Sequence, residues 1–184
     1  MMGMELGENS PVFGELINEV NPKVIIEVGS WKGASAIKMA KLAPQAKIYC
    51  IDTWLGCAKW MNTGVMKEDK EGHPTIFSKF IENTKGYNIT PIPAVSMDGL
   101  IFLFNKKIIA DLIYIDGCHY PIFVYLDAEY GFRLLRVGGV MFFDDYEGGW
   151  KKSVYEGIEN FLSKHIGEVE VKEVGSKFIM RRIK

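Results

Sequence analysis

Three aspartates directly follow two apolar segments that have the character of buried strands. Asp116 comes after residues 111–115, and Asp144 and Asp145 come after residues 140–143. Neighbouring parallel strands lie about 4.8 Å apart and end at the same edge of a sheet, so the three carboxylates can converge. Like charges that close must share a proton or a cation. The arrangement predicts a divalent-metal site that suits Mg²⁺, with Mn²⁺ or Ca²⁺ as alternatives.

His119 lies three residues beyond Asp116 and is the candidate general base, because an imidazole can accept a proton from a bound hydroxyl group. A cap on the following helix, or a surface ring, would explain His119 equally well. The aspartates also have an alternative explanation. Asp116 could form an ordinary Asp-Gly turn, and Asp144 and Asp145 could belong to an acidic loop.

A glycine turn near the N-terminus provides a second group of candidate residues. Val24–Val28 has the pattern of a strand buried on both faces, and helical spacing begins at Ala34. Between them, Gly29 and Gly33 form a turn whose free N–H groups favour a polar or anionic ligand. The turn is not a dinucleotide fingerprint, because Trp31 and Ala34 occupy the positions that need glycine. It is not a P-loop either, because the glycine spacing is one residue short.

Asp52 is the next candidate, at the end of a second strand predicted over residues 47–51. It follows Gly29 by 23 positions. A carboxylate about 20 residues beyond such a turn is placed to accept hydrogen bonds from ribose hydroxyls. A turn or helix-capping role is the alternative.

The stretch from Glu27 to Ser35 resembles the first motif of class I S-adenosylmethionine-dependent methyltransferases, in which an acidic residue precedes a G-x-x-x-G turn. In that family the turn wraps the methionine end of the cofactor, and a small polar residue and an apolar residue after the third strand hold the adenine. Ser96 could instead cap the helix that follows it. The resemblance implies these cofactor-binding residues: Glu27, Gly29, Ser30, Trp31, Gly33, Ser35, Asp52, Thr53, Trp54, Ser96, Met97 and Asp116.

The sequences IYIDGCHY and GGVMFFDDY resemble the metal-dependent O-methyltransferases, which include macrocin-type, catechol-type and cephalosporin-hydroxylase-like proteins. By position, the metal ligands that this resemblance implies are Asp116, Asp144 and Asp145. Catechol-type enzymes carry a lysine base where this chain has His119, and this difference leaves the base open. The resemblance covers roughly residues 24–146.

The element pattern predicts an α/β fold, a Rossmann-like three-layer sandwich with a mostly parallel seven-stranded sheet. Residues 168–174 and 177–182 form its C-terminal antiparallel hairpin, which is the methyltransferase arrangement by resemblance. Residues 1–184 are expected to form a single domain. Residues 56–74 break the periodic pattern and are interpreted as a substrate flap, although their aromatic residues could equally pack on the domain.

Composition narrows the range of partners. A net charge of −1, without a specific basic block, gives no reason to expect nucleic acid. No apolar run is long enough to span a membrane. Three cysteines without zinc spacing, and the absence of a signal segment, favour a reducing cytoplasm. The resembling family is often dimeric, which implies a homodimer here.

These observations predict S-adenosylmethionine-dependent methyl transfer to a hydroxyl oxygen of a small-molecule acceptor, assisted by a divalent metal. The alternatives are a metal-independent methyltransferase and a non-catalytic S-adenosylmethionine-binding protein. An oxidoreductase that uses a nicotinamide cofactor would share the architecture, but Trp31 argues against it.

Overall fold

The computed structural model describes residues 11–56, 75–146, 151–174 and 177–184. Its seven-stranded sheet has the order β3-β2-β1-β4-β5-β7-β6. The strands are β1 (Val24–Val28), β2 (Lys47–Asp52), β3 (Ile89–Pro93), β4 (Ala110–Ile115), β5 (Leu135–Phe143), β6 (Val169–Val174) and β7 (Lys177–Arg182). The first five strands are parallel, whereas β7 pairs antiparallel with both β5 and β6. The predicted fold class is confirmed.

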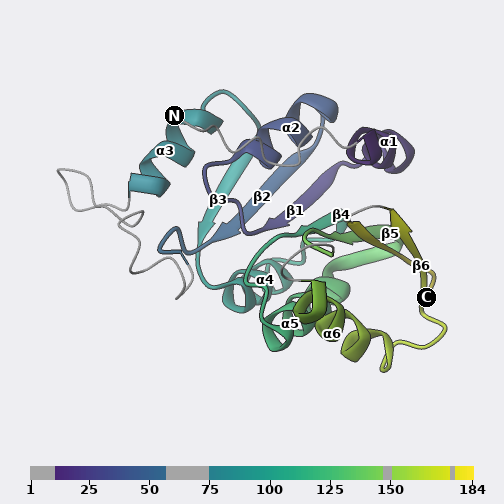
Figure 1. Cartoon of the computed structure of the whole chain (residues 1–184). Coiled ribbons are helices and arrows are strands. Elements are labelled where there is room, and N and C mark those ends of the chain that lie inside the picture. Colours follow the sequence, from purple (N-terminus) through teal and green to yellow (C-terminus); the bar gives the residue numbers. More distant parts are fainter. Residues whose placement is uncertain (1–10, 57–74, 147–150, 175–176) are drawn as a thin grey trace.

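Helices cover both faces of the sheet, as Figure 1 shows. One face carries α1 (Pro11–Val20), α2 (Ala34–Leu42) and α3 (Thr75–Thr84), and the other carries α4 (Ser96–Asn105), α5 (Pro121–Leu134) and α6 (Lys151–Leu162). Successive side chains of a strand point to opposite faces. Ile25 therefore joins the core under α1 to α3, and Ile26 joins the core under α4 to α6. The β1 strand is accordingly apolar almost throughout, as a strand covered on both faces requires.

The ends of the central strands lie level with one another. Val28 pairs with Ile51 of β2 and with Ile115 of β4, and Ile115 pairs with Phe143 of β5. The residues that follow these four strands therefore gather at one edge of the sheet. This register places the glycine turn, Asp52, Asp116 and the Asp144–Asp145 pair at the same edge.

Several element boundaries differ from those predicted. The sequence pattern predicts a helix over residues 120–135 that is closed by residues 137–139. In the structure this helix ends at Leu134, and β5 begins at once. The two glycines of residues 137–139 lie inside the strand, where Gly138 has a φ of 77° and the pairing with β4 shifts register. The sequence pattern predicted a helix end there because glycine is common just after the C-terminus of a helix.

Three further boundaries need correction. The sequence pattern predicts a last helix over residues 153–165, but the helix spans Lys151–Leu162. Beyond it, the His165 ring nitrogens lie 3.0 Å from Glu129 and 2.8 Å from Glu168. The third strand, predicted over residues 89–95, stops at Pro93, and its prolines are tolerated because β3 is an edge strand. Ser96 is the first residue of α4 and Val95 is the N-cap, so the capping alternative for Ser96 is wrong.

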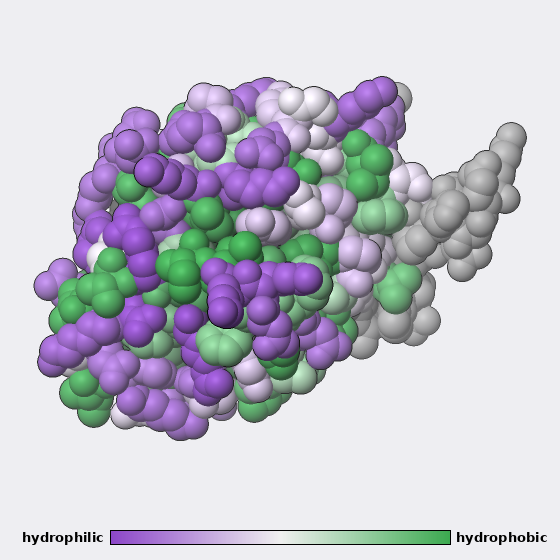
Figure 2. Space-filling model, turned by 180° about the vertical axis from the view of Figure 1, so that it is seen from behind, coloured by the Kyte–Doolittle hydropathy of each residue, from purple (hydrophilic) through white to green (hydrophobic). Residues whose placement is uncertain are grey.

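The surface is mixed in character. On the side shown in Figure 2, hydrophobic patches are interrupted by hydrophilic side chains and do not form one continuous area. The homodimer stays a prediction. Among the helices in the described ranges, none combines the length and the apolar character that crossing a membrane would need. The predicted flap lies, apart from Gly56, outside the described residues.

Candidate functional site

The glycine turn after β1 is packed directly against the loop after β4. Gly29 has a φ of 87°, and a Cβ atom there would lie 2.0 Å from the backbone oxygen of Asp116. Gly33 has a φ of 86°, and a Cβ atom there would lie 2.8 Å from Cγ2 of Thr84 in α3. At both positions, the neighbouring atoms leave no room for a side chain, and the positive φ also favours glycine. The Gly29 contact brings the predicted cofactor turn next to Asp116.

Glu27 is fully buried inside this unit. Its carboxylate accepts a hydrogen bond from the Ser35 hydroxyl at 2.5 Å and one from the Cys50 thiol at 3.3 Å. Burial raises the pKa of Glu27 to about 7, although these hydrogen bonds lower it in part. The structure thus makes Glu27 a link between β1, β2 and the first turn of α2. Ser30, which is 2% exposed, lies in the same turn.

Asp52 joins the loops after β1 and β2. One carboxylate oxygen accepts the Trp31 N–H at 2.8 Å, and the other accepts the Trp54 N–H at 2.7 Å. The Trp54 indole N–H donates to the Trp31 carbonyl at 2.8 Å, and its ring packs on Phe77 and Phe80. Because each carboxylate oxygen can accept more than one hydrogen bond, Asp52 keeps acceptor capacity for a ligand. The Trp54 side chain belongs to the core, and the neighbouring Thr53 is half-buried.

Helix starts at this edge leave backbone donors available. Helices α2, α4 and α5 all begin there without a side-chain hydrogen bond to their first turn. The first N–H groups of a helix have no partner within the helix and are satisfied by caps, water or ligands. The edge is therefore suited to a polar ligand that spans the loops after β1, β3 and β4.

Two of the three predicted metal ligands, Asp116 and Asp145, lie beside the candidate base His119. His119 Nε2 lies 3.1 Å from Oδ2 of Asp145 and 3.5 Å from Oδ1 of Asp116. Burial raises the pKa of Asp116 to about 6. Burial alone would lower the pKa of His119, but its hydrogen bonds to the two carboxylates and their charges raise it to about 9. The hydrogen bond from His119 in turn lowers the pKa of Asp145.

Asp144, the third predicted ligand, is engaged by other groups of the chain. Its Oδ1 forms an ion pair with the Lys177 ammonium and accepts the Asp145 N–H at 2.8 Å. Its Oδ2 accepts a hydrogen bond from the Tyr114 hydroxyl. The structure therefore brings Asp116 and Asp145 together with His119, and it does not bring Asp144 into that group. Neither Lys177 nor Tyr114 was among the residues that the sequence singled out.

Three of the five non-glycine residues with a positive φ in the described ranges lie at the same edge; the other two are Asn21 and Lys107. Trp31, Trp54 and Asp145 have φ values of 46°, 53° and 55°, which are uncommon for residues other than glycine. They follow β1, β2 and β5 respectively. Conformations of this kind cluster at ligand-binding sites, where the surrounding structure holds them in place.

The adenine candidates lie on the loop after β3. Met97 is 37% exposed, so its side chain is accessible to a ligand, and Ser96 is half-buried. Beneath them lies Asp127 of α5, which is 1% exposed, and its Oδ2 would be 3.3 Å from a Cβ atom at Gly117. Among the described residues, Asp127 Oδ1 has no hydrogen-bond partner.

The burial of Asp127 leads to a prediction about how stability depends on pH. Burial raises the pKa of Asp127 to about 7, although a hydrogen bond with the Ser96 side chain lowers it in part. Between about pH 4 and pH 7 the folded protein keeps a proton that the unfolded chain releases, so stability falls as pH rises through this range. We expect Asp127→Asn to remove this loss. The difference in free energy of unfolding between the variant and wild type should therefore grow in favour of the variant by about 2 to 3 kcal/mol from pH 5 to pH 8.

Urea unfolding at pH 5, 6, 7 and 8 measures this difference. Asp98→Asn, at an exposed position of α4, is the control and should stay within about 0.5 kcal/mol of wild type throughout. A difference between wild type and Asp127→Asn that does not change with pH would contradict the prediction.

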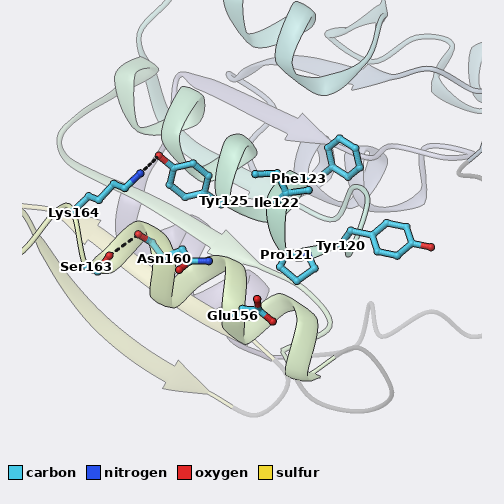
Figure 3. Close-up of a pocket in the computed structure, with 9 residues that line it drawn as sticks. All are labelled: Tyr120, Pro121, Ile122, Phe123, Tyr125, Glu156, Asn160, Ser163 and Lys164. Carbon is cyan, nitrogen blue, oxygen red and sulfur yellow. Dashed lines mark hydrogen bonds between the residues drawn. The ribbon is translucent and has the colours of Figure 1, made fainter.

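A groove of about 630 Å³ lies between α5 and α6, as Figure 3 shows. Tyr120 and Pro121 lie at one end, and Ser163 and Lys164 lie at the other. The groove is lined by neither the carboxylates nor the glycine turn. It is therefore separate from the candidate site.

Comparison with known proteins identifies the family. The family model described as "Methyltransferase domain" matches residues 26–146, which include the glycine turn, Asp52 and all three aspartates. The chain belongs to this methyltransferase domain family. No curated protein matches the chain.

Solved structures share the fold of this methyltransferase domain. The O-methyltransferase TomG from Streptomyces achromogenes, involved in tomaymycin synthesis and solved in complex with SAM, is 15% identical with a TM-score of 0.69, over 94% of this chain and 78% of that one. The O-methyltransferase from Bacillus cereus, solved in complex with SAH, is 20% identical with a TM-score of 0.66, over 95% of this chain and 82% of that one.

The donor set of the methyltransferase domain fits a divalent metal. Asp116, His119 and Asp145 each offer one ligand atom, and these atoms lie within 4.8 Å of one another. Ligands bound at about 2.1 Å to one octahedral ion lie about 3 Å apart in cis positions and about 4 Å apart in trans positions. The two carboxylates suit Mg²⁺ or Mn²⁺, whereas an imidazole is a poor ligand for Mg²⁺, and His119 would have to lose its proton to bind an ion.

Proposed function

We propose that this methyltransferase domain transfers a methyl group from S-adenosylmethionine to a hydroxyl oxygen of a small-molecule acceptor, with the assistance of a divalent metal. The observation that carries the proposal is the contact between the glycine turn and the carboxylate cluster, where Gly29 meets the backbone of Asp116. This contact would hold a cofactor in the turn beside an acceptor at the cluster. Membership of the methyltransferase domain family supports it.

The cofactor is assigned to the edge formed by the loops after β1, β2 and β3. The turn from Gly29 to Ser35 would receive the methionine end through the first N–H groups of α2, which have no side-chain cap. Asp52 would accept the ribose hydroxyls, and Ser96 and Met97 would contact the adenine. The SAM and SAH complexes of the two structural neighbours support this choice of cofactor.

The metal is assigned to Asp116, His119 and Asp145. The sequence predicted Asp144 as the third ligand, but its carboxylate is engaged by Lys177 and Tyr114. When bound, a divalent ion such as Mg²⁺ lowers the pKa of a coordinated hydroxyl group and holds it in place. Holding acceptor and methyl donor in attack geometry can contribute about 7 to 11 kcal/mol, so the rigid edge of the sheet is itself part of the mechanism.

A metal-independent methyltransferase is the second candidate, and one arrangement favours it. His119 lies between two carboxylates and Lys177 pairs with the third, so the cluster is balanced by cationic groups of the chain itself. In this case His119 would have to release its own proton before it could accept that of the acceptor hydroxyl, because the two carboxylates raise its pKa to about 9. Turnover that survives EDTA would favour this candidate over the first.

Isothermal titration calorimetry with S-adenosylhomocysteine tests the cofactor assignment. We expect wild type to bind and Asp52→Ala to bind about 10- to 100-fold more weakly, because a hydrogen bond to a charged group contributes about 1.5 to 3 kcal/mol. The control, Asp111→Asn, lies at the opposite end of β4 and should bind like wild type. Absence of binding by wild type would overturn the proposal.

Titration with Mn²⁺, followed by an acceptor screen with radiolabelled S-adenosylmethionine, tests the rest of the proposal. Catechols, phenols and sugars are the acceptors to screen, in the presence of Mg²⁺ and again after treatment with EDTA. Cofactor binding without metal binding would leave only the metal-independent candidate. Cofactor binding without transfer to any of these acceptors would count against an O-methyltransferase of this type.

A further inference from the structure

We propose that Lys177 withholds Asp144 from the metal, so that the ion is held by three protein ligands and keeps open positions for water and acceptor. This inference rests on the proposed function. Lys177 is the first residue of β7, and only 6% of its side chain is exposed. Its ammonium group forms an ion pair with Oδ1 of Asp144. A buried ammonium group is retained where a counter-charge holds it.

The other contacts of Asp144 complete this restraint. Its Oδ1 also accepts the Asp145 N–H at 2.8 Å, and its Oδ2 accepts a hydrogen bond from the buried Tyr114 hydroxyl. Three donors from three different strands or loops therefore hold one carboxylate. Its orientation is fixed by the chain before any ion arrives.

Asp145 makes a different set of side-chain contacts. Asp145 has a φ of 55°, and its Oδ2 lies 3.1 Å from His119 Nε2. Asp145 thus belongs to the group of Asp116 and His119, whereas Asp144 pairs with Lys177. Asp144 also shares the Tyr114 hydroxyl with Asp116, whose Oδ2 lies 3.5 Å from that hydroxyl. The charge of Asp144 is matched by Lys177, which leaves the two negative charges of Asp116 and Asp145 for a divalent ion.

Substitution of Lys177 should release Asp144. In Lys177→Met the side chain keeps its length but loses its charge, so Asp144 is free to join the ion and a nearby positive charge is lost. Both changes strengthen the binding of a cation. We expect Mn²⁺ to bind at least about tenfold more tightly, because affinity rises with the number of charged ligands. The water-proton relaxivity of bound Mn²⁺ should fall, because Asp144 displaces a coordinated water.

The double variant Lys177→Met with Asp144→Asn is the matched control. It removes one charge of each sign and leaves no unpaired buried charge, so it tests the proposal even if Lys177→Met does not fold. We expect wild-type Mn²⁺ affinity and relaxivity in the double variant, and in Lys177→Arg. Affinity for S-adenosylhomocysteine should be unchanged in every folded variant.

Two results would overturn the inference. If the double variant binds Mn²⁺ more than about 100-fold more weakly than wild type, then Asp144 is a ligand in wild type. If Lys177→Met binds Mn²⁺ with unchanged affinity or unchanged relaxivity, then Lys177 does not withhold Asp144.

The outcomes also separate this inference from the proposed function. If wild type binds no Mn²⁺ but Lys177→Met does, then the metal-assisted function is wrong while the restraint by Lys177 is supported. If neither protein binds Mn²⁺, then both proposals are wrong.

Discussion

Asp116→Asn is expected to lower kcat/KM for the acceptor that wild type methylates by about 10³-fold, which corresponds to about 4 kcal/mol of transition-state stabilisation. Asp116 contacts His119 and follows the strand that meets the cofactor turn, so it lies where metal, acceptor and cofactor converge. The amide keeps the size of the side chain but loses its charge. Steady-state kinetics with Mg²⁺, together with a Mn²⁺ titration, measure both effects.

Asp111→Asn provides the matched control for this experiment. Asp111 lies near the start of β4, five residues before Asp116, and accepts hydrogen bonds from Arg136 and from the Lys23 and Val24 N–H groups. Its substitution should lower stability while kcat/KM stays within about twofold of wild type. If Asp116→Asn retained wild-type turnover and metal affinity, the carboxylate cluster would have no part in the reaction.

The sequence predicted the position of the site because strand ends carry little ambiguity. A buried parallel strand such as β4 is recognisable as a short apolar run, and Asp116 follows it immediately. Parallel strands in one sheet end at the same edge, so the aspartates after β4 and β5 had to lie near each other and near the turn after β1. No side-chain geometry was needed for that step.

The different contacts of Asp144 and Asp145 could not be predicted from the sequence, because they depend on how β7 pairs with β5. Phe143 pairs with Phe178, which brings Lys177 opposite Asp144. The sequence predicted the hairpin but not its register against β5. Tyr114 carried a weak signal, since it lies two residues before Asp116 on the same face of β4.

The structure requires glycine at positions 29 and 33 for a reason that the sequence analysis did not identify. The sequence explained Gly29 and Gly33 by the approach of a ligand to the backbone. The structure shows that Gly29 is needed by the Asp116 backbone and Gly33 by Thr84. Contacts between segments so far apart in the chain cannot be inferred from local spacing.

Gly29→Ala is expected to be the most destabilising single substitution proposed here. The new Cβ atom would lie 2.0 Å from the Asp116 backbone oxygen and 2.8 Å from Cα of Gly117, so two backbone segments must separate. The φ of 87° adds a conformational cost of about 1 to 2 kcal/mol for a residue with a side chain. We expect urea unfolding to show a total loss of more than about 4 kcal/mol.

Gly86→Ala isolates the part of this loss that comes from the contact with Asp116. Gly86 has a φ of 90°, close to that of Gly29, but a Cβ atom there would meet nothing within 4 Å. It should therefore lose only the conformational cost, about 1 to 2 kcal/mol, and keep wild-type affinity for S-adenosylhomocysteine and Mn²⁺. Folded Gly29→Ala protein should lose affinity for both ligands, because the displaced segment carries Asp116 and borders the cofactor turn. Equal losses of stability in the two variants would mean that the loops after β1 and β4 are not in contact. The proposed site, in which the cofactor turn lies beside the carboxylate cluster, depends on that contact.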